Sequence, residues 1–257
     1  EAPLHDSFPY KFVVHTHPAW VNGMTCGRDG KAACERLFPD AMWVPYVDPG
    51  YTLCCVVRND MQAYAARTGH FPKVVVLQNH GVFIAGDSEQ EIRELYSEVM
   101  DKLECEYAIL GFADELLESP SPSQEECDAL HSLIQEISGE ARTLVSGPLA
   151  DVPHGPLTPD HIVYAKSYAL VGDVSKATFS AFEQRHGYAP TVIQTKTGVF
   201  GLGANQKDAE LALTFAYDGA LVQQLTGAFG GATYLTDASR EFIEQWEVEA
   251  YRKKIAI

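Results

Sequence analysis

Two segments that lie 117 positions apart resemble each other, and this internal similarity constrains the fold more than any other feature. Residues 75–86 read VVLQNHGVFIAG and residues 192–203 read VIQTKTGVFGLG. Each has an apolar run, a polar break that ends in glycine and a second apolar run, which is typical of two strands around a tight turn. We therefore predict that a helix–strand–strand–helix half-domain occurs twice. The alternative is that two strand–turn–strand units share their glycines for local reasons only.

The similarity extends beyond the two segments when the same ungapped alignment is kept. The helix expected after the first segment aligns with a helix expected at residues 205–226. The strand expected around Pro45 aligns with residues 161–163, which we therefore also expect to be extended. One difference bears on chemistry, because Thr197 stands where the first copy has His80. If His80 is functional, the second copy does not repeat its function.

The first half of the chain alternates strand patterns with helix patterns. Strands are expected at residues 12–16, 42–46, 74–78 and 82–85. Helices are expected at residues 19–26, 31–38, 51–67 and from 87 to about 118. In the last helix Ser88 and Glu91 match a capping box, and apolar residues recur every three or four positions. This order of elements indicates an α/β protein.

The stretch rich in serine and proline at residues 119–123 is the best candidate for a linker. An acidic helix is expected at 124–137, and an irregular stretch rich in Gly and Pro at 146–159. We therefore expect two parts. The first covers residues 1–118, and the second, 119–257, contains the helical linker, the degenerate copy and a C-terminal helix.

The charge balance excludes several classes of partner. The 257 residues include 19 Lys and Arg against 35 Asp and Glu, a formal net charge of −16, so we expect neither nucleic acid nor an anionic membrane surface. No apolar run approaches the roughly 18–20 residues that cross a bilayer. The six cysteines form no CxxC pair, which favours a reducing cytoplasm. The chain opens on Glu1 without a signal-peptide pattern, and we expect the natural protein to begin upstream.

Two histidines end the first expected strand. His15 and His17 are two residues apart, so they project from the same face and can converge on one ion. Catalytic zinc sites usually take three protein ligands, and His80 is the natural third because it follows a buried strand at a glycine-assisted break. The alternative is a pair of half-buried strand histidines without a metal.

Three motifs resemble the class II aldolase/adducin family: HTHP at 15–18, VPYVDPG at 44–50 and VVVLQNHGVFIAG at 74–86. The resemblance covers residues 1–118 continuously. LTPDHIVYAK at 157–166 and FIEQWEVEAYRKK at 242–254 resemble the long branch of the family, similar to the aldolase region of bifunctional rhamnulose-1-phosphate aldolase/alcohol dehydrogenases. The resemblance implies a three-layer αβα sandwich around a largely antiparallel or mixed sheet. The second half-domain is then a degenerate internal repeat.

The resemblance also implies roles for individual residues. Glu1, in the motif EAPLH, matches the general acid/base. His5 is expected either to be structural or to support the site from behind the ligands, and Asn79 to support it there. A phosphate-binding segment is implied before this glutamate, so either an upstream segment of the same protein supplies it or sugar phosphates are not bound as in relatives. A proton-donating tyrosine from a neighbouring subunit is also implied. Tyr46 and Tyr51 lie in the matching region and are expected to be structural.

These features favour a Zn²⁺-dependent aldolase that cleaves a ketose 1-phosphate to dihydroxyacetone phosphate and an aldehyde. The same three imidazoles also accept other divalent transition metals. The alternatives are a sugar-phosphate 4-epimerase on the same scaffold and a non-catalytic, adducin-like assembly protein. The expected partners are a small phosphorylated sugar and further copies of the chain, because family sites lie between subunits, with a tetramer favoured.

Two other features have simpler interpretations. His161 aligns with Pro45 in the repeat, which favours a structural role over a ligand or pocket role. GAFGG at residues 227–231 lacks the strand–turn–helix context of a dinucleotide-binding motif and is expected to be a tight loop between helices.

Overall fold

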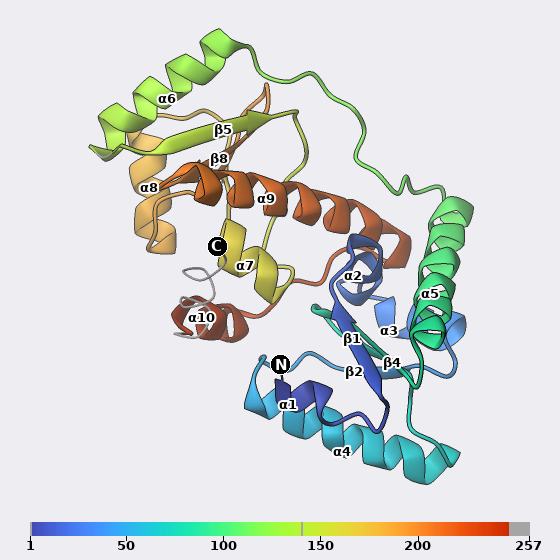
Figure 1. Ribbon diagram of the computed structural model, residues 1–257. Coiled ribbons are helices and arrows are strands. Elements are labelled where there is room, and N and C mark those ends of the chain that lie inside the picture. Colours follow the sequence, from blue (N-terminus) through green and yellow to red (C-terminus); the bar gives the residue numbers. More distant parts are fainter. Residues whose placement is uncertain (1, 140, 247–257) are drawn as a thin grey trace. The chain divides into compact units, whose positions relative to one another are not determined.

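The computed structural model describes residues 2–139 and 141–246 (Figure 1). Glu1 and the last part of the motif at 242–254, where the C-terminal helix is expected to end, therefore lie outside the described residues. The chain divides into two compact units. The first contains the residues up to Asp114 together with Val222–Tyr234, and the second contains Glu115–Leu221 together with the residues from Leu235 on. The return of Val222–Tyr234 to the first unit was not expected from the sequence.

The first unit is built on a four-stranded mixed sheet. Its strands are β1 (Phe12–Thr16), β2 (Met42–Val44), β3 (Val74–Leu77) and β4 (Gly81–Gly86), in the order β1-β4-β3-β2. β4 runs antiparallel to both β1 and β3, whereas β2 runs parallel to β3. The tight β3–β4 connection fits a hairpin, and β2 reaches its parallel partner through a helix, as parallel pairs require.

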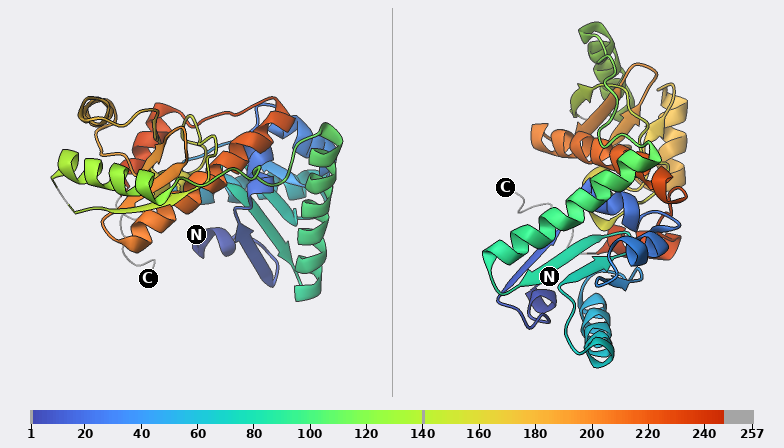
Figure 2. Two further views of the ribbon diagram at one scale, coloured as in Figure 1. Left: turned by 90° about the horizontal axis from the view of Figure 1, so that it is seen from above. Right: turned by 90° about the vertical axis from the view of Figure 1, so that its right-hand side faces the viewer.

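Helices cover both faces of this sheet. One face buries Val75, Leu77 and Phe83 in a core shared with α1 (Ala2–His5) and α4 (Tyr51–Thr68). The other face packs against α5 (Glu89–Leu110) and α2 (Ala19–Thr25), and α3 (Gly30–Leu37) packs beside α2. Figure 2 shows the sheet lying between α5 and α1. Strands buried on both faces are almost continuously apolar, which is the pattern of β3 and β4.

The second unit repeats this sheet. Its strands are β5 (Thr143–Gly147), β6 (Leu170–Val171), β7 (Val192–Gln194) and β8 (Val199–Gly203), in the order β5-β8-β7-β6. The pairings have the same directions as in the first unit: β8 is antiparallel to β5 and β7, and β6 is parallel to β7. The predicted duplication is therefore confirmed, and it extends to all four strands.

The second unit is also a three-layer sandwich. α6 (Gln124–Ser138) and α8 (Lys176–His186) contribute Leu130 and Phe179 to a core with Phe200 on one face of the sheet. On the other face, α7 (Pro159–Ala165) and α9 (Gln206–Thr226) contribute Ala165 and Ala212 to a core with Val192 and Val199. The 3₁₀ helix η1 (Gly227–Phe229), which belongs to the first unit, and the helix α10 (Asp237–Gln245) follow along the chain. The expected α/β fold with a mixed sheet is confirmed in both units.

Three expectations about individual elements were wrong. Residues 161–163 lie in α7 rather than in a strand, because Thr158 caps this helix and Pro159 occupies its first turn. The counterpart of β2 is instead β6. Helix α5 ends at Leu110 rather than near residue 118, since Gly111 adopts φ 78° and stops it. The irregular stretch expected from residue 146 begins only after β5. Local propensity did not indicate this strand, because it forms through pairing with β8.

No helix among the described residues is long and apolar enough to span a membrane.

Candidate metal centre

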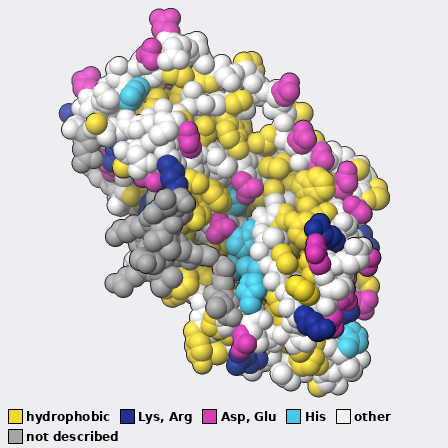
Figure 3. Space-filling view, viewed as in Figure 1, with side chains coloured by type: hydrophobic (Ala, Val, Ile, Leu, Met, Phe, Trp, Pro, Cys, Tyr) yellow, Lys and Arg dark blue, Asp and Glu magenta, His cyan; other side chains and the backbone are white. Residues whose placement is uncertain are grey.

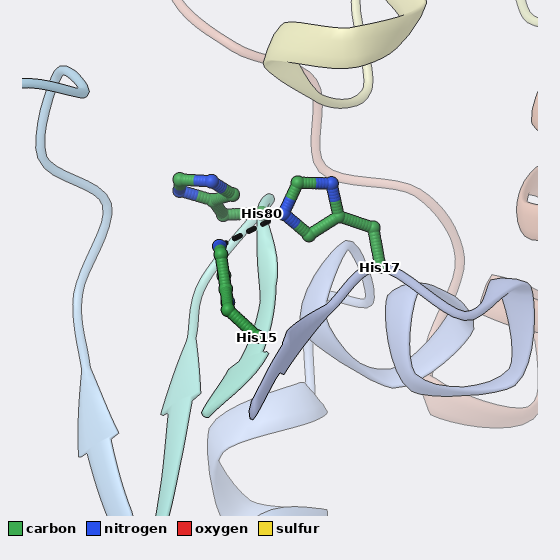
Figure 4. A group of neighbouring side chains, drawn as sticks. All are labelled: His15, His17 and His80. Carbon is green, nitrogen blue, oxygen red and sulfur yellow. Dashed lines mark hydrogen bonds between the residues drawn. The ribbon is translucent and has the colours of Figure 1, made fainter. Parts of the chain in front are cut away.

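His15, His17 and His80 converge at one end of the first sheet (Figure 4). One ring nitrogen from each lies within 4.8 Å of the others, and the Nε2 atoms of His15 and His17 are 2.9 Å apart. His80 is buried, whereas His15 and His17 are partly exposed. Histidine side chains are visible at the surface in Figure 3. The cluster is therefore buried at His80 and accessible to solvent at His15 and His17.

The two strand histidines are positioned by the alternation of β1. His15 pairs with Phe83 of β4, and its ring stacks on the Phe83 ring at 3.8 Å with an interplanar angle of 7°. His17 follows on the same face just beyond the strand. The HxH spacing thus gives the predicted geometry.

His80 is positioned by the turn between β3 and β4. Asn79, immediately before it, adopts φ 51°, a left-handed conformation that asparagine tolerates better than most residues. The Asn79 amide donates to the Thr233 carbonyl at 2.8 Å, and its backbone N–H donates to the Thr25 carbonyl. Asn79 is buried and therefore holds the turn that presents His80. A supporting role for Asn79 in the site stays a prediction.

Hydrogen bonding fixes the orientation of His15. Its Nδ1 lies 3.0 Å from the Val82 carbonyl oxygen, which can only accept, so Nδ1 carries the hydrogen and donates. Nε2 is then left with a lone pair directed toward the other two imidazoles. A histidine that binds a metal usually donates its other ring N–H to a carbonyl or carboxylate in this way.

The three imidazoles fit one divalent transition-metal ion. Zinc binds imidazole nitrogen at about 2.0–2.1 Å, so nitrogens around one ion lie roughly 3–3.5 Å apart. The present separations of 2.9 Å to at most 4.8 Å bracket that range and require only small side-chain rotations. Three nitrogen ligands with solvent access are the donor set of a catalytic site with an open position.

His5 contacts Phe83, the residue on which His15 stacks. Its ring meets the Phe83 ring edge-on at a centroid distance of 5.5 Å. Phe83 therefore contacts both His5 and His15, and it is itself fully buried. The importance of Phe83 was missed from the sequence, although its recurrence as Phe200 in the second copy was a signal that this position is constrained.

Other predicted residues are not part of the cluster. Glu1 lies outside the described residues. Tyr51 begins α4 and is exposed, and the Tyr46 backbone N–H donates to the Gln78 side chain. His161 is buried in the second unit between the Thr158 hydroxyl at 2.7 Å and the Asp218 carboxylate at 2.9 Å, as expected for a structural histidine.

Replacing Gly81 by Ala should impair the metal centre. A Cβ at Gly81 would lie 2.4 Å from Cδ2 of His17 and 2.5 Å from the Thr16 carbonyl oxygen, so the His17 ring has to move. We expect the affinity for Zn²⁺ to fall at least about tenfold, as when the support of a metal ligand is lost. Competition with a chromophoric chelator measures this affinity.

Gly198→Ala is the matched control, because Gly198 occupies the same turn of the second copy. Its added Cβ would meet the Gly147 carbonyl oxygen at 2.6 Å and Cδ of Pro122 at 2.7 Å. Both variants should lose stability from overpacking, typically by about 1–3 kcal/mol. Equal metal affinities in the two variants would show that Gly81 has no specific role in placing His17.

Comparisons with known proteins place the first unit in context. A family model described as the class II aldolase and adducin N-terminal domain matches residues 2–107. The protein named "Uncharacterized oxidoreductase YuxG" of Bacillus subtilis (strain 168) is 33% identical over 91 residues, which cover 35% of this chain and 12% of that relative. The N-terminal class II aldolase domain of a conserved protein from Thermoplasma acidophilum is 26% identical, with a TM-score of 0.35. That match covers 41% of this chain and 46% of the solved one.

Proposed function

We propose that this chain, whose residues 2–107 match the class II aldolase and adducin domain, provides the catalytic centre of a metal-dependent aldolase. The proposed reaction cleaves a ketose 1-phosphate to dihydroxyacetone phosphate and an aldehyde. The convergence of His15, His17 and His80 is the observation that carries this proposal. The paired strands β1 and β4 and the turn at Asn79 hold these three side chains together.

The three histidines would hold the ion by their ring nitrogens. When bound, the metal supplies a positive charge that polarises the carbonyl of the substrate and stabilises the negative charge that develops there. His15 contributes a fixed tautomer because its Nδ1 donates to Val82, and Phe83 restricts the rotation of its ring. His80 contributes from a buried position on a turn that Asn79 holds.

Cleavage transfers two protons. One leaves the hydroxyl group on the carbon atom that becomes the aldehyde, and one is added to the carbon atom next to the carbonyl of the other fragment, where a general acid/base is needed. The family resemblance assigns this role to Glu1, since a carboxylate in a partly desolvated site is a suitable general base. Glu1 is followed directly by α1, whose His5 packs against Phe83. We propose Glu1 as this base, and Glu1→Gln should retain bound metal while losing turnover.

The competing functions share the site and differ in the products. A 4-epimerase would start with the same bond cleavage but recombine the fragments before release. A non-catalytic adducin-like protein has no need of three converging histidines, so the preserved cluster favours an enzyme. The name of the Bacillus relative describes a protein of which only 12% is matched, and we do not extend oxidoreductase activity to this chain.

Product analysis separates these functions. The full chain, loaded with Zn²⁺, is incubated with fuculose 1-phosphate, rhamnulose 1-phosphate and, separately, ribulose 5-phosphate. The proposal predicts dihydroxyacetone phosphate from a ketose 1-phosphate, and loss of this product after treatment with a chelator. A change of configuration without free fragments would establish the epimerase instead. Absence of any conversion by the metal-loaded chain, in the presence of any upstream segment of the natural protein, would refute both enzymes.

We also propose that the chain acts as a homo-oligomer, with a tetramer favoured, because the family's sites use a tyrosine from a neighbouring subunit. Sedimentation equilibrium of the metal-loaded chain tests this proposal, and a monomer at micromolar concentration would contradict it.

A further inference from the structure

The GAFGG segment at residues 227–231 pairs with the loop between α2 and α3. The backbone N–H groups of Arg28 and Asp29 donate to carbonyl oxygens of this segment at 3.0 and 2.9 Å. Gly27 forms an isolated antiparallel bridge with Ala232, the residue that follows the segment. The two stretches are far apart in the sequence, and both belong to the first unit. The GAFGG segment therefore does more than connect two helices.

Glycines on both sides allow this close approach. Gly230 and Gly231 adopt φ 80° and 88°, left-handed conformations that glycine reaches without strain. The Gly230 carbonyl oxygen accepts a hydrogen bond from Nε of Arg28 at 2.5 Å. On the other side, a Cβ at Gly27 would lie 2.6 Å from Cβ of Phe229. The contact thus leaves no room for a side chain at Gly27.

The same pairing leads to the turn that carries His80. Thr233 donates its backbone N–H to the Cys26 carbonyl at 2.7 Å, and its own carbonyl accepts from the Asn79 amide at 2.8 Å. The Asn79 backbone N–H donates to the Thr25 carbonyl at 3.2 Å. Asn79, Thr25 and Cys26 are all buried. Asn79 is therefore held by the end of α2 and by Thr233, which is itself held by the end of α2.

The direction of the His80 side chain depends on Asn79. Asn79 adopts φ 51°, and a residue other than glycine keeps a left-handed conformation only where its surroundings hold it. Because His80 is the next residue, a rotation of the Asn79 backbone would turn the His80 ring relative to His15 and His17. Loss of the support of a ligand typically lowers metal affinity about 10–100-fold. The bonds that hold Asn79 therefore bear on the metal centre.

We infer that the segment Val222–Tyr234, through Thr233 and Asn79, is a positioning element of the metal centre. It does not contact the ion, and it acts by fixing the turn that presents His80. The inference rests on the assignment of His80 as a ligand in the proposed function. Residues 2–107, which match the family model, then supply the ligands but not all of their support. A segment that follows most of the second unit in the sequence completes the centre.

Gly27→Ala in the full chain tests the inference by pushing the two paired stretches apart. The added Cβ would meet Cβ of Phe229 at 2.6 Å and the Phe229 carbonyl oxygen at 3.0 Å, so the backbone of the segment has to shift. We expect the affinity for Zn²⁺, measured by chelator competition, to fall at least about tenfold. Gly219→Ala is the matched control in the second unit, because its Cβ would meet Cγ of Pro153 at 2.5 Å. This control should leave the affinity unchanged.

Asn79→Gly tests the residue that connects the segment to His80. Glycine keeps the left-handed backbone without strain and removes the amide that donates to Thr233. The affinity for Zn²⁺ should again fall at least about tenfold. Because Gly27→Ala and Asn79→Gly break the same connection, the double variant should lose little more than the larger single loss. Independent effects would instead add in free energy.

The visible spectrum of bound Co²⁺ separates positioning from a general loss of stability, because it reports the arrangement of the ligands. At saturating Co²⁺ the spectrum should change in Gly27→Ala and Asn79→Gly and stay unchanged in Gly219→Ala. An unchanged spectrum together with the affinity of Gly219→Ala, or additive losses in the double variant, would overturn the inference and leave the metal centre intact. Failure of the unaltered chain to bind metal through His80 would refute the metal centre and the inference together.

Discussion

We expect His80→Ala to abolish stable metal binding by this chain and, with it, the proposed metal-dependent cleavage of a sugar phosphate. His80 is the one buried histidine of the three, and the other two project from one face at the end of β1, with His17 just beyond the strand. Weakening the support of a ligand typically costs 10–100-fold in metal affinity, so removing a ligand should cost more than about 100-fold. Elemental mass spectrometry after dialysis measures the metal content per chain, which should be lost in this variant.

His154→Ala provides the control for this experiment. His154 belongs to the second unit, and its side chain is largely exposed, so the substitution removes an imidazole without affecting the cluster. This variant should retain a full complement of metal. A full complement in His80→Ala as well would contradict the assignment of His80 as a ligand.

Phe83→Ala should lower the free energy of unfolding strongly and should also lower the affinity for Zn²⁺. Phe83 is fully buried, and truncation of such a ring typically costs about 3–5 kcal/mol. It also removes the surface on which the His15 ring stacks and against which His5 packs. Urea denaturation measures the first effect, and chelator competition in the absence of urea measures the second.

Phe200→Ala separates these two effects, because Phe200 holds the same position in the second copy and is equally buried. We expect a comparable loss of stability, confined to the second unit because each unit has its own core. The affinity for Zn²⁺ should remain unchanged in Phe200→Ala and fall at least about tenfold in Phe83→Ala. An equal fall in both variants would indicate general loosening of the protein rather than support of His15.

The parts of the fold that follow from local rules could be predicted from the sequence. The period of two places His15 and His17 on one face, and the glycine after His80 marks the turn that presents it. The comparison of the two glycine-containing segments predicted the duplication, because apolar and glycine positions in a buried hairpin are constrained by packing. The cluster of three histidines could therefore be predicted from residue spacing, turn chemistry and the family motifs.

The remainder depends on contacts between distant segments. Thr233 supplies the carbonyl that holds Asn79, and no local pattern relates these two residues. β5 is extended because β8 pairs with it, although Ser146 and Gly147 are weak strand formers. The ungapped alignment failed at residues 161–163 because the cap at Thr158 favours a helix there. Glu1 remains a prediction from the family motif.

X-ray absorption at the zinc edge of the metal-loaded full chain tests the central claim most directly. We predict one zinc per chain with three imidazole nitrogens at about 2.0–2.1 Å and oxygen ligands in the remaining positions. The chain contains six free cysteines among the described residues, so sulfur is the main competing ligand. A sulfur shell near 2.3 Å, or fewer than three imidazoles per zinc, would contradict the assignment of His15, His17 and His80.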